Sequence, residues 1–198
     1  MDRAICTKIW LIMFVGVILP RAGWSNEPVP AGYQSIATEQ DVPHTVLYAI
    51  ALTESGKQIK SVGDYRPWPW TLNLAGRGYF FDSRLEAWQA LMGWIGEGKR
   101  SIDIGLMQVS WKYHKDKLGN IWQALDPYHN LRIAAVILQD CFKQRRDWWA
   151  SVGCYHSPKN SGRAQRYRLR VVGHWQRLEA NGQHIQMARQ YNGPIYKE

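Results

Sequence analysis

The stretch that decides the fold runs from Pro43 to Gly56 and reads Pro-His-Thr-Val-Leu-Tyr-Ala-Ile-Ala-Leu-Thr-Glu-Ser-Gly. Its apolar residues fall on one stripe of a helix, which is typical of a buried helical face. They are Val46, Leu47, Ile50 and Ala51. Proline suits the first position of a helix, and glycine is typical of the position after its last turn. The sequence therefore predicts a helix that starts at Pro43, ends at Gly56 and carries Glu54 in its last turn.

Glu54 is placed where ionisation is unfavourable. The apolar helix before it removes water from the carboxyl group, and the negative end of the helix dipole lies nearby, so both effects raise the pKa of Glu54. A carboxyl group that is protonated at neutral pH can donate its proton to a glycosidic oxygen. Position alone does not separate this role from that of an ordinary solvated glutamate at a helix end.

Outward from this helix, the chain alternates between turn-rich segments and helical patterns. Residues 57–69 contain Gly63, Pro67 and Pro69 and predict a loop. Residues 70–74 and 78–81 are rich in strand-forming residues and predict a hairpin with a three-residue loop, Ala75-Gly76-Arg77. The capping box Ser83/Glu86 predicts a helix that stops at Gly98. A short third strand is predicted within 101–110. Further helices are predicted from 126 onward, at 148–155 and at 164–178. This order predicts an α+β domain, mainly helical, with a small antiparallel β-sheet.

Two further segments place polar groups beside small or apolar residues. Residues 105–108 read Gly-Leu-Met-Gln, which suits a tight floor beneath a ligand, and Gln108 can donate and accept hydrogen bonds toward sugar hydroxyl or N-acetyl groups. Residues 152–156 read Val-Gly-Cys-Tyr-His, and Tyr155 could direct its hydroxyl at the acid or at a substrate. Taken singly, an ordinary strand-to-turn segment and a buried tyrosine with a satisfied hydroxyl fit these residues equally well.

Together, the three segments resemble the ordered motifs of the family 1 lytic transglycosylases, which have a lysozyme-like fold. The motifs are Ala51-Leu52-Thr53-Glu54-Ser55, then Gly105-Leu106-Met107-Gln108, then the small-residue stretch with Tyr155. The resemblance covers roughly residues 33–178. It implies that Glu54 is the catalytic acid and base, and that Ser55, Met107, Gln108 and Tyr155 line the substrate site around it.

Residues 68–73 (Trp-Pro-Trp-Thr-Leu-Asn) and 101–104 (Ser-Ile-Asp-Ile) resemble the subgroup associated with conjugation, type IV pilus and secretion machines. The third motif departs from the family, which usually has Tyr-Asn-x-Gly where this chain has Tyr155-His156-Ser157-Pro158. The substrate contacts on that side therefore differ from the family pattern. The resemblance implies peptidoglycan glycan strands as the substrate, components of such an apparatus as partners, and a monomeric enzyme.

By resemblance, one glutamate carries the reaction. It protonates the oxygen between N-acetylmuramic acid and N-acetylglucosamine, then accepts the proton of the muramoyl 6-hydroxyl, which closes a 1,6-anhydro ring without water, metal or cofactor. A muramidase that hydrolyses the same bond is an alternative and needs a second carboxylate, for which Asp64, Asp82 and Asp103 are available and Asp103 is the candidate base. An inactive peptidoglycan-binding assembly factor is a second alternative, which the altered third motif permits.

Residues 1–25 predict an export signal. Arg3 and Lys8 precede the apolar run Ile9–Leu19, and cleavage after Ser25 fits the small residues there. The run is shorter than the roughly 20 residues that span a membrane, and an uncleaved anchor is the alternative. We expect a periplasmic protein with a linker at 26–32, one domain at 33–178 and a tail at 179–198.

Charge and cysteines add two expectations. The formal charge is +9, and the segment from Lys143 to Arg177 is rich in Lys and Arg, which predicts an acidic partner, with a merely solvated basic face as the alternative. Peptide carboxylates of peptidoglycan fit this prediction, whereas export argues against nucleic acid. Cys6 would leave with the signal segment, so Cys141 and Cys154 predict a disulfide, with two buried free thiols as the alternative. The remaining Cys and His residues show no zinc-like spacing.

Overall fold

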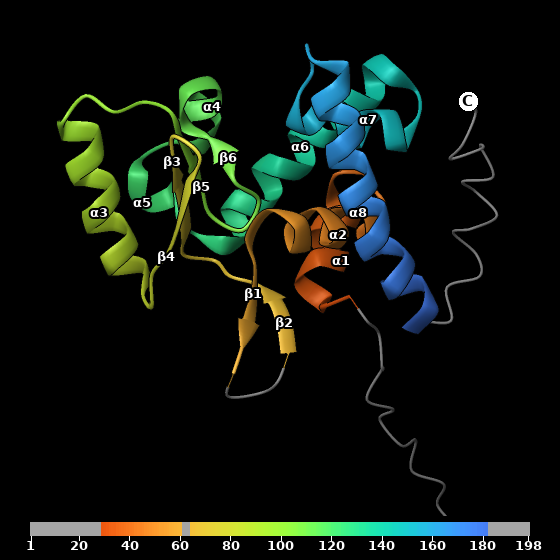
Figure 1. The fold of residues 1–198 in the computed structure, drawn as a ribbon, viewed down its shortest axis with the longest axis horizontal. Helices are drawn as coiled ribbons and strands as arrows, with labels where there is room; N and C mark the ends of the chain where they lie inside the picture. The colour runs from red at the N-terminus through yellow and green to blue at the C-terminus, as the bar shows by residue number, and fades with distance from the viewer. Residues whose placement is uncertain (1–28, 61–63, 182–198) are drawn as a thin grey trace, which may run out of the picture.

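The computed structural model describes residues 29–60 and 64–181 (Figure 1). The predicted signal segment 1–25 lies outside these residues, as do residues 26–28 of the predicted linker and 182–198 of the predicted tail. Helix α1 starts at Ala31, inside the predicted linker, and helix α8 runs to Asn181, inside the predicted tail. No helix in the described ranges combines the length and the apolar character needed to cross a membrane.

The elements confirm an α+β, mainly helical architecture with small antiparallel sheets. The helices are α1 (Ala31–Glu39), α2 (His44–Ser55), α3 (Arg84–Gly96), α4 (Trp111–Leu118), α5 (Ile121–Ala124), α6 (Pro127–Arg145), α7 (Trp148–His156) and α8 (Ser161–Asn181). The strands are β1 (Gly56–Ile59), β2 (Asp64–Pro67), β3 (Thr71–Leu74), β4 (Arg77–Phe80), β5 (Ile102–Ile104) and β6 (Val109–Ser110). Figure 1 shows α3 and the larger sheet on one side of the molecule and α1, α2, α7 and α8 on the other.

Helix α2 lies at the centre of the core. Its residues 45–52 are all buried, because α1 and α8 pack against it. A helix that is apolar on every side is stable only inside a domain. The predicted bounds are confirmed except that Pro43 is the N-cap residue, one position before the helix, and Gly56 is the C-cap. The buried helix therefore carries Glu54 to a fixed place at the edge of the core.

The predicted hairpin is confirmed as β3 and β4, but its loop has two residues. Ala75 and Gly76 both have positive φ, 52° and 93°, and Leu74 pairs with Arg77. Two residues with positive φ form the turn that matches the twist of a hairpin. Strand β3 also pairs with β5, which continues to β6, so the order of the larger sheet is β4-β3-β5-β6.

The predicted loop at 57–69 is wrong, because β1 and β2 form a separate antiparallel hairpin there. None of its strand residues is buried and few are strand formers, so the sequence carries no alternation of apolar and polar residues to reveal it. Gly56 is required at its base, since a Cβ atom there would overlap the Tyr65 hydroxyl. Pro67 pairs opposite Gly56 at the end of the ladder, where a proline is tolerated.

Helices α6 and α7 are joined by the predicted disulfide. The Asp126 side chain accepts from the His129 backbone N–H and starts α6, and Asp147 accepts from Ala150 and starts α7. Between them Arg146 adopts a left-handed conformation that reverses the chain. Cys141 and Cys154 thereby come together, with Cα atoms 5.9 Å apart, and the bond is confirmed.

We expect the double substitution Cys141→Ser and Cys154→Ser to lower the free energy of unfolding by about 3 kcal/mol, because the bond closes a loop of 13 residues in the unfolded chain. Urea unfolding of the oxidised wild type and of the double variant measures the difference. Reduced wild-type protein is the matched control and should unfold near the variant. Equal midpoints for oxidised and reduced wild type would contradict the expectation.

Candidate active site

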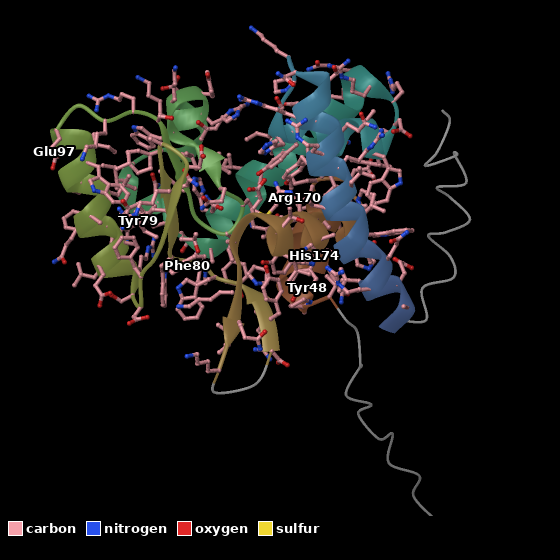
Figure 2. All side chains as sticks on the ribbon, in the orientation of Figure 1. Tyr48, Tyr79, Phe80, Glu97, Arg170 and His174 are labelled. Atoms are coloured by element: carbon pink, nitrogen blue, oxygen red, sulfur yellow. A yellow bond between two sulfur atoms is a disulfide. The ribbon has the colours of Figure 1, made fainter. Side chains whose placement is uncertain are left out.

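Glu54 faces a cleft of about 980 Å³. The cleft is lined by the larger sheet and α4, by part of α6, and by α7 and α8. Its wall includes Thr53, Asn73, Asp103, Gln108, Tyr155 and His156. In Figure 2, Arg170 and His174 lie along α8 on the side that faces the sheets. Helix α2 thus delivers its last turn to the junction between the two sides of the molecule.

The 105–108 segment forms a turn that is held from both sides. The Ser55 hydroxyl donates to the Leu106 carbonyl at 2.7 Å, and the Tyr155 hydroxyl donates to the Met107 carbonyl at 2.7 Å. The Gln108 amide donates to the Gly105 carbonyl at 2.9 Å. The structure therefore brings the residues of all three sequence motifs together around Glu54.

Two of the predicted substrate-binding residues lie behind the cleft wall. The side chain of Ser55 is 1% exposed and that of Met107 is 0% exposed, because each packs beneath the turn it supports. Their place differs from the predicted place on the cleft surface. Gln108 and Tyr155 line the cleft as predicted.

Asn130 is a buried polar residue that the sequence did not single out. It is 0% exposed on α6, and its side-chain amide donates to the Ile104 carbonyl at 2.9 Å and the Ala124 carbonyl at 3.2 Å. Its side-chain oxygen accepts from the Met107 N–H at 3.0 Å. Gly105, at φ 81°, passes so close that an added Cβ would lie 2.7 Å from this amide. Asn130 therefore fixes the turn that carries Gln108.

Tyr167 is a second site residue that none of the three sequence motifs contains. It lies on α8 and its side chain is buried. Its hydroxyl donates to Glu54 Oε1 at 2.6 Å. His156 stacks on that ring, with centroids 4.2 Å apart and planes 2° apart. The only signal available in sequence was the apolar stripe of α8, which Tyr167 shares with Val171. That stripe indicates burial and does not indicate a partner.

The carboxyl group of Glu54 is partly buried in the wall of the cleft. Burial raises its pKa from 4.5 to about 7, and the nearby Asp103 carboxylate adds to the rise. The Tyr167 hydrogen bond and the Arg170 guanidinium both favour the ionised form and lower the pKa. Burial is the largest of these effects, so Glu54 keeps its proton to a higher pH than an exposed glutamate does.

Asp103 is the second carboxyl group in the cleft wall. It lies on β5, opposite Asn73 on β3 and Ser110 on β6. Burial raises its pKa, and a hydrogen bond from the Ser110 side chain lowers it. Within the described ranges, no group of three or more His, Cys, Asp or Glu side chains is placed to hold a metal ion.

Residues 33–170 match the family model of the transglycosylase SLT domain. The chain belongs to this family. The match confirms the resemblance to lytic transglycosylases and the lysozyme-like fold class, and it indicates peptidoglycan cleavage of the lytic transglycosylase type. Searches of curated proteins and of solved structures returned no match. All the groups described around Glu54 belong to the matched part of this SLT domain.

Proposed function

We propose that this SLT domain cleaves the bond between N-acetylmuramic acid and N-acetylglucosamine, with Glu54 as both acid and base and a 1,6-anhydro sugar as the product. The observation that carries the proposal is the Glu54 carboxyl group itself. It faces the cleft with a pKa raised to about 7 and is oriented by the Tyr167 hydroxyl. A carboxyl group titrating near neutral pH can donate a proton in one step and accept one in the next.

The proton balance needs one carboxyl group. Protonated Glu54 donates to the glycosidic oxygen as the bond from the muramoyl C1 carbon breaks, and the resulting carboxylate accepts the proton of the muramoyl 6-hydroxyl. The 6-oxygen then bonds to C1, so no water enters the product. Tyr167 occupies Glu54 Oε1, which leaves Oε2 as the oxygen that exchanges the proton.

Product analysis tests this proposal. Purified peptidoglycan is digested, and the released muropeptides are separated and weighed. The proposed reaction yields ends that are one water lighter than the reducing ends from hydrolysis. Reducing ends would support a muramidase, and no release at all would support a binding factor.

Asp103→Asn separates the transglycosylase from the muramidase. If no water-activating base is needed, the variant should keep most of its activity below the pKa of Glu54. Loss of the Asp103 charge should also move the fall in activity at high pH to lower pH, because that charge raises the pKa of Glu54. The pH dependence of kcat/KM measures both effects. A loss as large as that of Glu54→Gln would instead make Asp103 the base of a hydrolase.

Tyr167→Phe should move the fall in activity at high pH to higher pH. The Tyr167 hydroxyl stabilises ionised Glu54 and so lowers its pKa, and without it the proton is retained to higher pH. A general acid is active while it is protonated, so the activity of the variant should persist to higher pH than that of the wild type. Tyr155→Phe is the matched control, because that hydroxyl donates to the Met107 carbonyl. It should lower activity without moving the profile, and an unmoved profile for Tyr167→Phe would contradict this role.

We also propose that the protein is exported through residues 1–25 and opens the wall locally for an envelope-spanning apparatus. The support is the subgroup resemblance of residues 68–73 and 101–104. These segments meet in the larger sheet, where Leu72 pairs with Ile104. Deleting the gene in its host should impair transfer or secretion, and restoring Glu54→Gln protein should not repair it. Unchanged transfer in a host without a redundant enzyme would count against this role.

A further inference from the structure

Helix α8 presents a positively charged face to the cleft. Arg163, Tyr167 and Arg170 are spaced four and three residues apart and therefore share one side of the helix. Tyr167 reaches Glu54 from this side, and both arginines line the cleft. The arginines lie about 10 Å apart along the helix axis, one turn or so on either side of Tyr167. Lys159, just before the helix, lines the same wall.

The charges on this face make no close ion pair with the protein, although Arg170 lies near enough to Glu54 to lower its pKa. Among the described residues, Lys159, Arg163 and Arg170 make no ion pair with a carboxylate within 4.0 Å. On the opposite wall, by contrast, Lys117 faces Asp140 at 4.0 Å. The excess positive charge of the cleft is therefore concentrated on α8.

The two arginines also act on a neighbouring histidine, His156. Burial lowers the pKa of His156, and Arg170 and Arg163 lower it further. His156 is thus neutral near pH 7 and adds no charge of its own, while the two arginines remain charged. An open, positively charged wall beside the catalytic carboxyl group attracts an anionic part of the ligand.

We propose that Lys159, Arg163 and Arg170, which we call the α8 cationic face, bind the carboxylates of the peptide stems on muramic acid and make the enzyme prefer stem-bearing glycan strands. This inference rests on the proposed function. A glycan strand whose lactyl groups are in amide linkage to stems has no charge in its sugars, so the cations have no partner there. The stems carry free carboxylates, which arginine binds through paired hydrogen bonds.

The geometry also explains why the charges flank the reaction centre. Stems leave the strand at every muramoyl residue, and the bond to be cut joins a muramoyl residue to its neighbour. A stem beside the scissile bond therefore lies near α8 while the sugars lie over Glu54 and Gln108. Binding the stem carboxylates would hold the muramoyl C1 carbon near the Glu54 carboxyl group.

The test compares two substrates, glycan strands with intact stems and the same strands after an amidase has removed the stems and the lactyl carboxylates that this hydrolysis leaves have been converted to neutral amides. The enzyme is the mature protein, and kcat/KM is measured for the wild type, for Lys159→Gln with Arg163→Gln, and for Arg166→Gln. Arg166 is an exposed residue of α8 outside the cleft wall, and Arg166→Gln is the control for the loss of a single positive charge from α8. Circular dichroism and the midpoint of thermal unfolding verify that each variant is folded.

We expect the wild type to favour stem-bearing strands by about tenfold or more, the size of one or two charge-assisted contacts. The double variant should lose most of this ratio, mainly through a higher KM for stem-bearing strands, and Arg166→Gln should keep it. Equal kcat/KM of the wild type on both substrates would overturn the proposal, as would an equal loss by the double variant on both. Absence of anhydro products from either substrate would instead overturn the proposed function.

Discussion

Replacing Glu54 by Gln should lower peptidoglycan cleavage by about 10²–10⁴-fold, to near background, because general acid and base catalysis contributes that much. Gln keeps the size of the side chain and can still accept the Tyr167 hydrogen bond, but it has no proton to give to the glycosidic oxygen. Asp103, the other carboxyl group of the cleft wall, lies on β5 and is hydrogen-bonded to the Ser110 side chain, so it does not replace Glu54. Release of soluble muropeptides from purified peptidoglycan measures the loss.

Glu97→Gln is the matched control. Glu97 is exposed at the end of α3, pairs with Lys99 at 2.6 Å and lies outside the cleft wall. The Glu97→Gln substitution removes a carboxyl group far from the site, and the activity of this variant should equal that of the wild type. Normal cleavage by Glu54→Gln protein would defeat both the transglycosylase and the muramidase interpretations and leave another residue to carry the reaction.

Glu54→Gln should also change how stability depends on pH. The pKa of Glu54 is raised from 4.5 to about 7 by folding, so the folded state holds a proton that the unfolded state releases between these values. The contribution of Glu54 to the free energy of unfolding of the wild type is therefore fully present below pH 4.5 and is lost as the pH rises through 7. The variant should match the wild type at pH 4 and exceed it by about 2 kcal/mol at pH 8, a value discounted because the cleft is open to water. Urea unfolding at both pH values measures this difference, and a variant that is less stable at pH 8 would contradict it.

The sequence predicted α2 and its glutamate well because local signals agree there. The proline before the helix, its apolar residues and the glycine after it all favour the same bounds. The same kind of signal predicted α6, whose Asp126 cap and Pro127 mark its start. Elements of this kind are specified by residues that are neighbours in the chain.

The missed helices lack such agreement. Helix α1 begins after Pro30, which makes no side-chain cap, and its first residues continue a proline-rich stretch that predicts a linker. Helix α4 is polar and kinked at His114, where φ is −129°, so its apolar spacing is broken. Both are held by packing against other elements, which a local pattern does not record.

The residues of the candidate site also fall into two groups, those that a sequence motif indicates and those that only tertiary packing brings to the site. Glu54, Gln108 and Tyr155 were singled out because they lie in ordered motifs. Tyr167 is 113 residues from Glu54 in the chain, and its hydrogen bond arises only because α8 packs on α2. The sequence predicts a helix at 164–178 around Tyr167, but the partner of its hydroxyl depends on tertiary structure.

Asn130→Ala should be the most destabilising single substitution proposed here, lowering the free energy of unfolding by about 3–5 kcal/mol. The change removes three hydrogen bonds of a residue that is 0% exposed and leaves the Ile104 and Ala124 carbonyls and the Met107 N–H without their partner. Each buried group left unpaired costs about 1–3 kcal/mol, partly relieved by relaxation. Urea unfolding measures the loss.

The same substitution should lower activity in the protein that remains folded, because the turn at 105–108 loses its anchor and Gln108 moves with it. Asn130→Asp is the matched variant, since Asp keeps the shape and can accept from the Met107 N–H, yet as a carboxylate it faces two carbonyl oxygens. It should be at least as destabilising as Ala at pH 8 and recover in part at pH 4, where the protonated acid donates to one carbonyl. If Asn130→Ala unfolds at the urea concentration of the wild type and keeps its kcat/KM, then the turn that carries Gln108 is held by the Ser55 and Tyr155 hydrogen bonds and not by Asn130.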